Sequence, residues 1–191
     1  ASFLASGQNV RPTRLLEAGF RFAKPTIEDF FEGTDHAVVD RLDLHRYMGT
    51  WYEIARFDHR FERGLSEVTA TYTLMPDGTV RVENRGCKHK KPYDVCKTAE
   101  GRAKIPDPSQ PGKLKVSFFL SFYSDYYVLE LDQDEYNYAL IGSSSDKYLW
   151  ILSRAPILPE EIKKKLLDAA TRRGYDVKKL IWVEQREKKI M

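Results

Sequence analysis

The stretch RYMGTWYEIARF, residues 46–57, places a tryptophan and a tyrosine directly after Gly49 and Thr50. Aromatic residues favour strands, and a glycine permits the tight backbone turn that often precedes one. The stretch therefore predicts a β-strand over residues 50–58. Whether Trp51 is only part of that strand or belongs to a ligand site depends on the segments that follow.

Short apolar segments with turn signals between them recur along the chain. Proline and Asp-Gly in residues 75–78 supply the backbone angles of a tight reversal, and the next segment alternates apolar and polar residues. Eight antiparallel strands with short connections predict an all-β, up-and-down barrel, with a two-sheet sandwich as the alternative. The strands are expected over residues 50–58, 66–74, 79–84, 100–105, 113–119, 126–131, 136–142 and 148–153.

The periodicity changes near the C-terminal end. Pro159 and the two glutamates after it suit a helix N-terminus, because proline fits the first turn and carboxylates complement the helix dipole. Apolar residues then recur at helical spacing up to Gly174, which predicts a helix over residues 159–173 on the outside of the barrel. A short final strand is expected over residues 180–184.

Composition indicates one folded domain, since 42% of the residues are hydrophobic and 13% are aromatic. We expect the barrel domain over residues 38–185, after an N-terminal extension, residues 1–37, that is partly helical or flexible. Residues 186–191 form a basic tail. A net charge of +3 does not indicate a nucleic-acid surface. The basic residues after Pro159 predict a solvated face, with contact to an anionic membrane as the alternative.

The chain has two cysteines, Cys87 and Cys96. The segment between them, residues 88–95, is interpreted as a hairpin loop that brings the two positions close. This favours a local disulfide and an oxidising compartment, with two free thiols as the alternative. No second cysteine pair and no histidine lies at the spacing of a zinc site beside them, so we expect no metal and no cofactor. The apolar runs are too short to span a bilayer as helices.

Three motifs in order resemble the signatures of the lipocalin family. They are GTWY at residues 49–52, LDQDEYNYAL at residues 131–140 and Arg154 in ILSR, and a helix follows them. The resemblance covers residues 38–185 and is greatest to the bacterial outer-membrane lipocalins, apolipoprotein D and the plant temperature-induced lipocalins. The middle motif has DQDEY at residues 132–136 where many lipocalins carry Thr-Asp-Tyr. This turn therefore aligns with the family only to within about one residue. The lipid-modified first cysteine of the bacterial members has no counterpart here.

By this resemblance, Gly49, Trp51 and Arg154 form a structural plug at the closed end of the barrel rather than a ligand site. The guanidinium would lie on the indole, a cation–π contact of about 1–2 kcal/mol when it is shielded from water. Tyr52 should then face outward, towards the packing helix.

Alternation from Arg154, matched to the family, predicts which side chains face the cavity. Alternation from Trp51 turns Glu53 inward and alternation from Tyr126 turns Glu130 inward, where a carboxylate needs a partner or a bulge must shift the alternation. The small residues Ala99 and Gly101 leave room opposite the bulky ones. The predicted ligand-binding residues are Trp150, Tyr126, Tyr72, Asn84, Phe118, Val116, Val128, Ile141, Tyr148 and Ala103.

The resemblance implies a non-enzymatic protein that binds a fatty acid, a lysophospholipid or a similar hydrophobic molecule in the barrel. Its role would be lipid storage, transport or repair in the bacterial periplasm or outer membrane, or after secretion. A lipocalin-fold enzyme acting on a lipid or tetrapyrrole and an interaction module with a filled barrel are the alternatives. Common catalytic motifs are missing, and Asp58 with His59 is interpreted as a polar loop. Peripheral membrane contact and a homodimer are left open.

Overall fold

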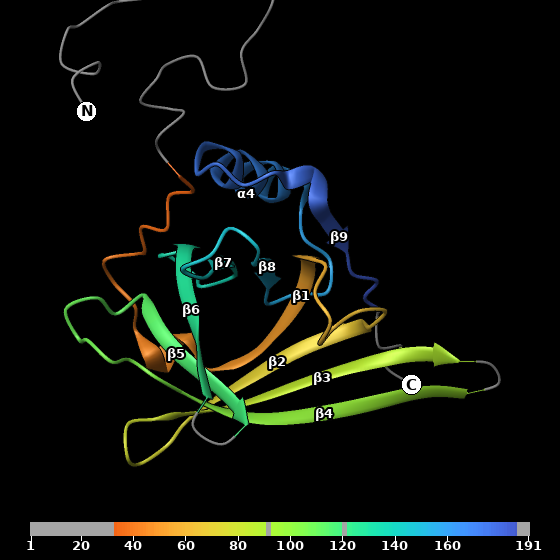
Figure 1. Ribbon diagram of the computed structural model, residues 1–191, viewed down its shortest axis with the longest axis horizontal. Coiled ribbons are helices and arrows are strands. Elements are labelled where there is room, and N and C mark those ends of the chain that lie inside the picture. The colour runs from red at the N-terminus through yellow and green to blue at the C-terminus, as the bar shows by residue number, and fades with distance from the viewer. Residues whose placement is uncertain (1–32, 91–92, 120–121, 187–191) are drawn as a thin grey trace, which may run out of the picture. The chain divides into compact units, whose positions relative to one another are not determined.

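The computed structural model describes residues 33–90, 93–119 and 122–186 (Figure 1). Strands dominate, and one long helix lies near the C-terminal end. In chain order the elements are α3 (Leu44–Tyr47), β1 (Gly49–Phe57), β2 (Ser66–Leu74), β3 (Val80–Lys90), β4 (Tyr93–Lys104), β5 (Lys113–Phe119), β6 (Phe122–Leu131), β7 (Tyr138–Gly142), β8 (Leu149–Ser153), α4 (Glu160–Arg172), the 3-10 turn η2 (Val177–Lys179) and β9 (Leu180–Trp182).

The sheet closes on itself. Its strand order is β2-β3-β4-β5-β6-β7-β8-β1-β9, every pairing in the ladder is antiparallel, and an additional β1–β2 pairing completes the ring. Residues 49–52 of β1 pair with β2, whereas residues 55–57 pair with β9, so the two partners share one strand. The predicted eight-stranded up-and-down barrel is confirmed, and the sandwich alternative is wrong because β1 to β8 pair in sequence order and β1 closes the ring with β8.

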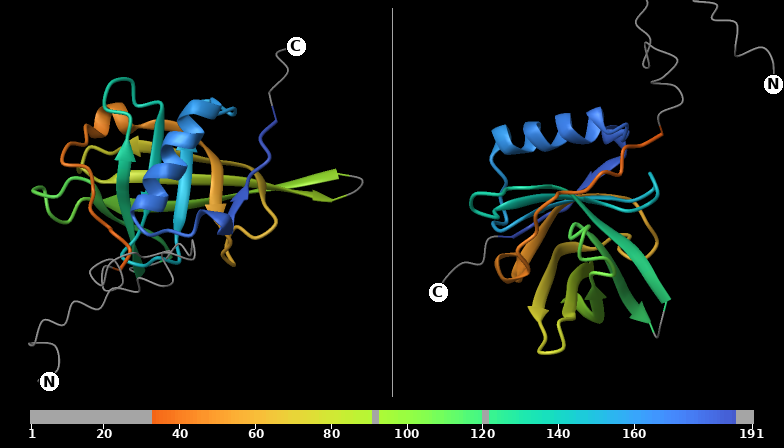
Figure 2. Two further views of the ribbon diagram at one scale, coloured as in Figure 1. Left: turned by 90° about the horizontal axis from the view of Figure 1, so that it is seen from above. Right: turned by 90° about the vertical axis from the view of Figure 1, so that its left-hand side faces the viewer.

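Apolar side chains pack on both faces of this sheet. One cluster fills the inside of the barrel around Trp51, and the second lies outside, between the sheet and α4. The helix covers one side of the barrel (Figure 2). It buries Leu166, Ala169 and Ala170 on one face, as helical spacing predicts. Among the described residues no helix has the length and apolarity needed to cross a lipid bilayer.

The protruding β3–β4 hairpin differs from the prediction of a loop over residues 88–95. The ladder continues in unbroken register to the pair Lys90 and Tyr93, and it places Cys87 opposite Cys96. Their Cα atoms are 3.9 Å apart, and a disulfide joins them. Lysine-rich strands that extend beyond the barrel have no buried face, so the apolar alternation that would reveal them is missing.

Some residues outside the predicted barrel domain, residues 38–185, contact it. Asp35 and Ala37, expected in the N-terminal extension, both contact Arg173, directly after α4. The backbone amide of Asp35 donates to the Arg173 carbonyl (2.8 Å), and the Arg173 guanidinium donates to the Ala37 carbonyl (2.8 Å). At the other end, Arg186 of the expected basic tail forms an ion pair with Asp94 (3.1 Å). Residues 1–32 and 187–191, which hold the rest of both segments, lie outside the described part.

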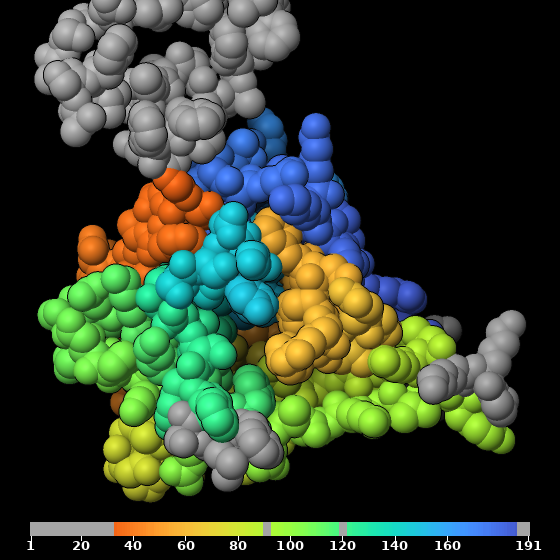
Figure 3. Space-filling model, in the orientation of Figure 1, coloured from red at the N-terminus to blue at the C-terminus, as the bar shows by residue number. Residues whose placement is uncertain are grey.

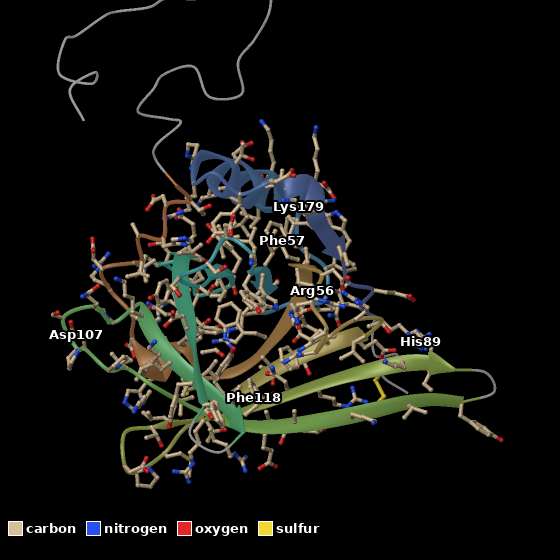
Figure 4. The ribbon with its side chains drawn as sticks, viewed as in Figure 1. Arg56, Phe57, His89, Asp107, Phe118 and Lys179 are labelled. Carbon is tan, nitrogen blue, oxygen red and sulfur yellow. A yellow bond between two sulfur atoms is a disulfide. The ribbon has the colours of Figure 1, made fainter. Side chains whose placement is uncertain are left out.

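Two β-bulges change which side chains enter the barrel. The register of β1 shifts between Glu53 and Ala55, so Glu53 and Arg56 both point inward while Phe57 turns towards α4 (Figure 4). The register of β6 shifts in the same way between Val128 and Glu130. Glu130 consequently faces outward and pairs with Arg173 of the α4 C-terminus (3.0 Å). The inward orientation predicted for Glu130 is therefore wrong.

Arg154 closes one end of the barrel. Its guanidinium carbon lies 3.9 Å from the centre of the Trp51 ring, and Nε donates to the carbonyl of Tyr136 (3.3 Å). Gly49 has a φ of +93°, which favours glycine, and approaches Nη1 closely. The remaining nitrogens donate to the carbonyls of Arg46 (2.8 Å), Tyr47 (3.1 Å), Met48 (2.8 Å) and Thr50 (3.0 Å).

We expect Arg154→Ala to lower the free energy of unfolding by about 2–4 kcal/mol, because the carbonyls at the end of α3 lose their donors together with the contact to Trp51. Urea titration followed by circular dichroism measures the change. Arg172→Ala, at an exposed position of α4, is the matched control and should stay within about 0.5 kcal/mol of the wild type. Equal losses in the two variants would contradict the bracing role.

Candidate functional site

The inside of the barrel divides into a buried floor and a more open upper half. Nearer the plug, the inward side chains are at most 7% exposed: Trp51, Tyr72, Val82, Ala103, Leu114, Val128, Ile141 and Leu152. The next inward residues along the strands are half-buried or exposed: Ala70, Asn84, Ala99, Gly101, Val116, Tyr148 and Trp150. The surface is hollowed between the segment around residues 58–65 (gold) and β6 (green) in Figure 3.

Three tyrosines from separate elements meet in the lower part of this chamber. The Tyr126 hydroxyl lies 2.6 Å from that of Tyr47 and 3.0 Å from that of Tyr72. Burial raises the pKa of all three phenols, so they remain neutral at physiological pH. Satisfying one another's hydroxyls lets these polar tips lie within an apolar core. The alternation in sequence predicted Tyr72 and Tyr126 here but missed Tyr47, which belongs to the short helix α3.

A band of charged side chains crosses the chamber above the floor. Arg56, which is 1% exposed, donates from Nη1 to Glu53 (2.6 Å) and from Nη2 to the backbone carbonyl of Glu62 (2.6 Å). The Glu62 carboxylate in turn accepts from Trp150 Nε1 (3.2 Å) and lies 2.8 Å from His59 Nε2. We call Glu53, Arg56, His59, Glu62 and Trp150 the polar band.

The two carboxyls of the polar band differ in their protonation. Burial raises the pKa of Glu53 well above its ordinary value, the nearby Glu62 carboxylate adds to the rise, and Arg56 opposes it. Burial alone would also raise the pKa of Glu62, but the close His59 ring, the hydrogen bond from Trp150 and the positive charge of Arg56 outweigh it and lower the pKa. Glu62 therefore carries the negative charge, and Glu53 is the group that holds a proton more readily.

An inward polar atom near the band is left without a partner. Oδ1 of Asn84 is buried and has no hydrogen-bond partner among the described residues, and the same holds for Nε of Arg56. Each such buried group costs free energy until something satisfies it. The chamber thus combines apolar walls with a few unsatisfied polar atoms, as small-molecule sites do.

The predicted ligand-binding residues do not all lie in one place. Tyr148 and Trp150 stack on each other at 5.9 Å on the wall of the upper half, as the alternation along β8 predicted. Phe118, in contrast, is 42% exposed, and its ring lies so close to Gly101 that a Cβ added there would be 2.8 Å from it. The register of β5 against β6 is irregular between Val116 and Phe119, which removes the alternation on which its inward placement rested.

Asp58 and His59 do not form a catalytic pair. Asp58 accepts from Nε of Arg63 (2.9 Å), whereas His59 faces Glu62 and packs edge-on against Trp150 with ring centres 5.4 Å apart. The sequence analysis treated His59 as a loop residue and missed both Arg56 and Glu62 as inward groups. No local pattern marks them, because the bulge in β1 and the fold of the β1–β2 connection place them there.

A second group of charged residues lies outside the barrel, beside the disulfide. Ligand-type atoms of Glu67, His89 and Asp94 lie within 4.8 Å of one another. Arg186 already supplies the positive charge there, since Nη1 is 3.1 Å from Asp94 and Nε is 3.6 Å from Glu67. We therefore interpret the group as an ion-pair cluster that attaches the C-terminal segment to the β3–β4 hairpin (Figure 4).

Comparisons with known proteins agree with this geometry. A family model described as a lipocalin-like domain matches residues 42–185, and one described as a domain of unknown function (DUF1731) matches residues 1–33. The outer membrane lipoprotein Blc of Citrobacter freundii is 50% identical over 148 residues, 78% of this chain and 82% of that protein. Temperature-induced lipocalin-1 of Arabidopsis thaliana is 43% identical over 158 residues, again 78% and 82%.

The fold is also similar to a solved structure. Insecticyanin from the tobacco hornworm Manduca sexta superposes with a TM-score of 0.63 and 24% identity. The match covers 80% of this chain and 86% of insecticyanin. At this identity the likeness concerns the fold alone.

The raised pKa of Glu53 predicts a pH dependence of stability. The folded protein retains a proton that the unfolded chain releases above its ordinary pKa of 4.5, so this contribution is complete below that pH and is lost as the pH rises through the raised pKa. Glu53→Gln is neutral at every pH. We expect it to match the wild type near pH 4.5 and to exceed its stability at pH 8 in urea titrations.

Two controls test whether the polar band causes this effect. Arg56→Met leaves two buried carboxyls without their cation and should lose about 3–5 kcal/mol at pH 8. The exposed Glu135→Gln should follow the wild type at both pH values. A Glu53→Gln variant that is less stable than the wild type at pH 8 would show that the Glu53 carboxylate is needed as a charged partner of Arg56.

Proposed function

The chain belongs to the lipocalin family, as its motifs indicated, and from that premise we propose that its barrel binds one amphipathic lipid. A fatty acid or a lysophospholipid fits the chamber by chemical character, because its tail matches the apolar floor. An eight-stranded barrel has room for one small ligand. The observation that supports the proposal most directly is the half-open upper chamber, in which Asn84 Oδ1 is buried without a hydrogen-bond partner among the described residues.

The polar band suggests how the lipid is oriented. The floor lies towards the plug and the band towards the open end, so a tail that reaches the floor leaves its polar head near His59 and Glu62. Two carboxyls face one arginine in the band, and Glu62 is the charged one. An added fatty-acid carboxylate would meet like charge there, whereas the zwitterionic head of a lysophosphatidylethanolamine adds no net charge and carries an ammonium that can pair with Glu62. We therefore favour the lysophospholipid.

Binding rather than catalysis is our proposal for the activity. The titratable groups of the chamber are engaged with one another, and Glu53 and Glu62 share the single cation Arg56. Storage, transport or repair of membrane lipid is the role that follows. The relatives named outer membrane lipoprotein support a place in the bacterial envelope, and the Cys87–Cys96 disulfide agrees with an oxidising compartment.

Two substitutions in the chamber test the site. Trp150→Ala and Tyr126→Ala should each weaken binding of a fluorescent fatty acid by roughly five- to thirtyfold, equivalent to about 1–2 kcal/mol of lost apolar contact. Fluorescence titration in solution measures the dissociation constant. The matched controls are Trp182→Ala on β9 and Tyr127→Ala on the outer face of β6, both expected to bind as the wild type does. Unchanged binding in both chamber variants would place the ligand elsewhere.

The preference for an amine-bearing head group has its own test. Competition against the same probe should show lysophosphatidylethanolamine displacing it at lower concentration than a fatty acid of equal chain length at pH 7.5. Glu62→Gln removes the charge but keeps the shape, so it should narrow the difference between the two ligands by roughly three- to tenfold. Equal narrowing by Glu135→Gln, on the outside, would refute the role of Glu62.

A further inference from the structure

A disulfide lies where the β3–β4 hairpin leaves the barrel. Cys87 and Cys96 are opposite each other in the ladder, and β2 stays paired with β3 only as far as Cys87. On the other side, β4 pairs with β5 over residues 102–104 alone. Beyond the disulfide the hairpin therefore has no third strand among the described residues, and it projects from the barrel (Figure 2). Because a two-stranded ribbon is only marginally stable in water, the cross-link contributes much to holding its strands together.

The two sulfurs of this disulfide differ in accessibility. Cys87 is 1% exposed, whereas Cys96 belongs to the exposed residues of the hairpin. Access decides which sulfur of a disulfide a thiolate attacks, and exposed disulfides are the ones that thiols reduce readily. Attack at Cys96 makes the buried sulfur of Cys87 the leaving group. The disulfide is therefore open to thiol exchange from one side.

The face of the hairpin that carries the disulfide also binds the C-terminal segment. His89 and Asp94 form the ladder pair two positions beyond the cysteines, so their side chains share that face. The Arg186 guanidinium lies 3.1 Å from Asp94 and 3.1 Å from Nδ1 of His89. Figure 4 shows the disulfide and His89 on neighbouring parts of the hairpin. Arg186 thus joins the C-terminal segment to the part of the hairpin that the disulfide holds.

Residues 183–186, which we call the latch, occupy a gap in the barrel wall. β1 and β2 pair directly over residues 49–52 and 69–72, and further along β1 pairs with β9 instead. The latch follows β9 and continues between the two strands. Its Val183 amide donates to the carbonyl of Ile54 on β1 (2.9 Å).

The latch also bonds to β2. The Glu184 carbonyl accepts from the backbone amide of Glu67 (2.7 Å). The side-chain amide of Gln185 spans the gap, since its Nε2 donates to the carbonyls of Glu53 on β1 (2.7 Å) and Val68 on β2 (2.9 Å). Glu53 is a member of the polar band, so the latch forms the barrel wall beside that band.

We propose that the Cys87–Cys96 disulfide is a thiol-exchange site whose reduction frees the latch. A thiolate of a dithiol reductant bonds to Cys96 Sγ, the bond between the two cysteine sulfurs breaks, and its electron pair goes to Cys87 Sγ. The second thiol of the reductant then attacks the mixed disulfide and releases the sulfur of Cys96. The two protons of the dithiol end on the two cysteines, which are reduced, while the reductant is oxidised to a disulfide.

Reduction loosens the latch through the hairpin. Without the cross-link the lysine-rich ribbon loses its fixed base, so His89 and Asp94 no longer hold Arg186 in one place. The latch then keeps only a few hydrogen bonds, and segments with so few contacts open readily. An open latch exposes the barrel wall beside Glu53, so we expect a bound ligand to leave faster. That last step alone rests on the proposed function.

Mass spectrometry locates the attacked sulfur. Incubation of the folded chain with glutathione, followed by acid quenching and digestion, should place the mixed disulfide on Cys96 roughly tenfold more often than on Cys87. Dithiothreitol should reduce the disulfide in the folded protein without urea. A disulfide that dithiothreitol opens only in urea, or an adduct found mainly on Cys87, would overturn the exchange site.

Hydrogen exchange measures the latch. The amides of Val183 and Glu67 are the two reporters, since each donates across the gap. Reduction should speed their exchange by roughly tenfold. The Arg173 amide, which donates to the Ala169 carbonyl at the end of α4 (3.1 Å), should change by less than about twofold. Unchanged exchange at both reporters in the reduced protein would contradict the link between disulfide and latch.

Substitutions separate the disulfide from the ion-pair cluster. Arg186→Gln cuts the latch from the hairpin with the disulfide intact, so its oxidised form should already exchange fast at both reporters, and reduction should add less than about twofold. Arg172→Gln, at an exposed position of α4, is the matched control and should respond to reduction as the wild type does. The double variant Cys87→Ser, Cys96→Ser should resemble the reduced wild type. Equal responses to reduction in Arg186→Gln and Arg172→Gln would refute the part played by Arg186.

Release of the fluorescent fatty acid connects the latch with the chamber. Its dissociation rate should rise roughly three- to tenfold on reduction and in Arg186→Gln. Faster amide exchange with an unchanged release rate would refute this step. A wild type that does not bind the probe contradicts only the lipid proposal, because amide exchange needs no ligand. The two proposals can therefore fail independently.

Discussion

The stacking of Arg154 on Trp51 is the contact on which the rest of the structure depends. One side chain at the end of β8 binds the carbonyls that end α3 and the start of β1, so it joins the first and last strands of the barrel at one end. A guanidinium can do this because it offers five donors in a plane whose face still contacts the indole. With that end closed, the chamber opens towards the opposite end, where the inward residues are half-buried or exposed.

The polar band shows what the bulge in β1 achieves. Without the bulge, Arg56 would face α4, and Glu53 would lie inside the barrel with no cation beside it. Desolvation makes such an unpaired carboxylate costly. Shifting the alternation by one residue supplies the cation and turns Phe57 to the helix in the same step. Buried ion pairs add little net stability compared with apolar residues of the same size.

The sequence predicted those parts of the fold whose information is local. Tyr72, Val82 and Leu152 were placed correctly because their strands keep an unbroken register against a neighbour over the relevant pairs. Glu130 was misplaced because a bulge changes the alternation without any change in residue type. The polar band was missed because Glu62 reaches the chamber from a connection. Such placements depend on contacts distant in sequence, which a single sequence does not display.

Along the barrel axis the chemistry changes in three steps: plug, apolar floor and polar band. In the proposed function a lipid lies in the barrel tail first, with its tail at the floor and its head at the polar band. Entry from water would expose that tail on the way, at about 0.8 kcal/mol for each methylene. The apolar floor would return this free energy on binding, because the tail then lies among apolar side chains again. The floor and the polar band are thus the two ends of one amphipathic chamber.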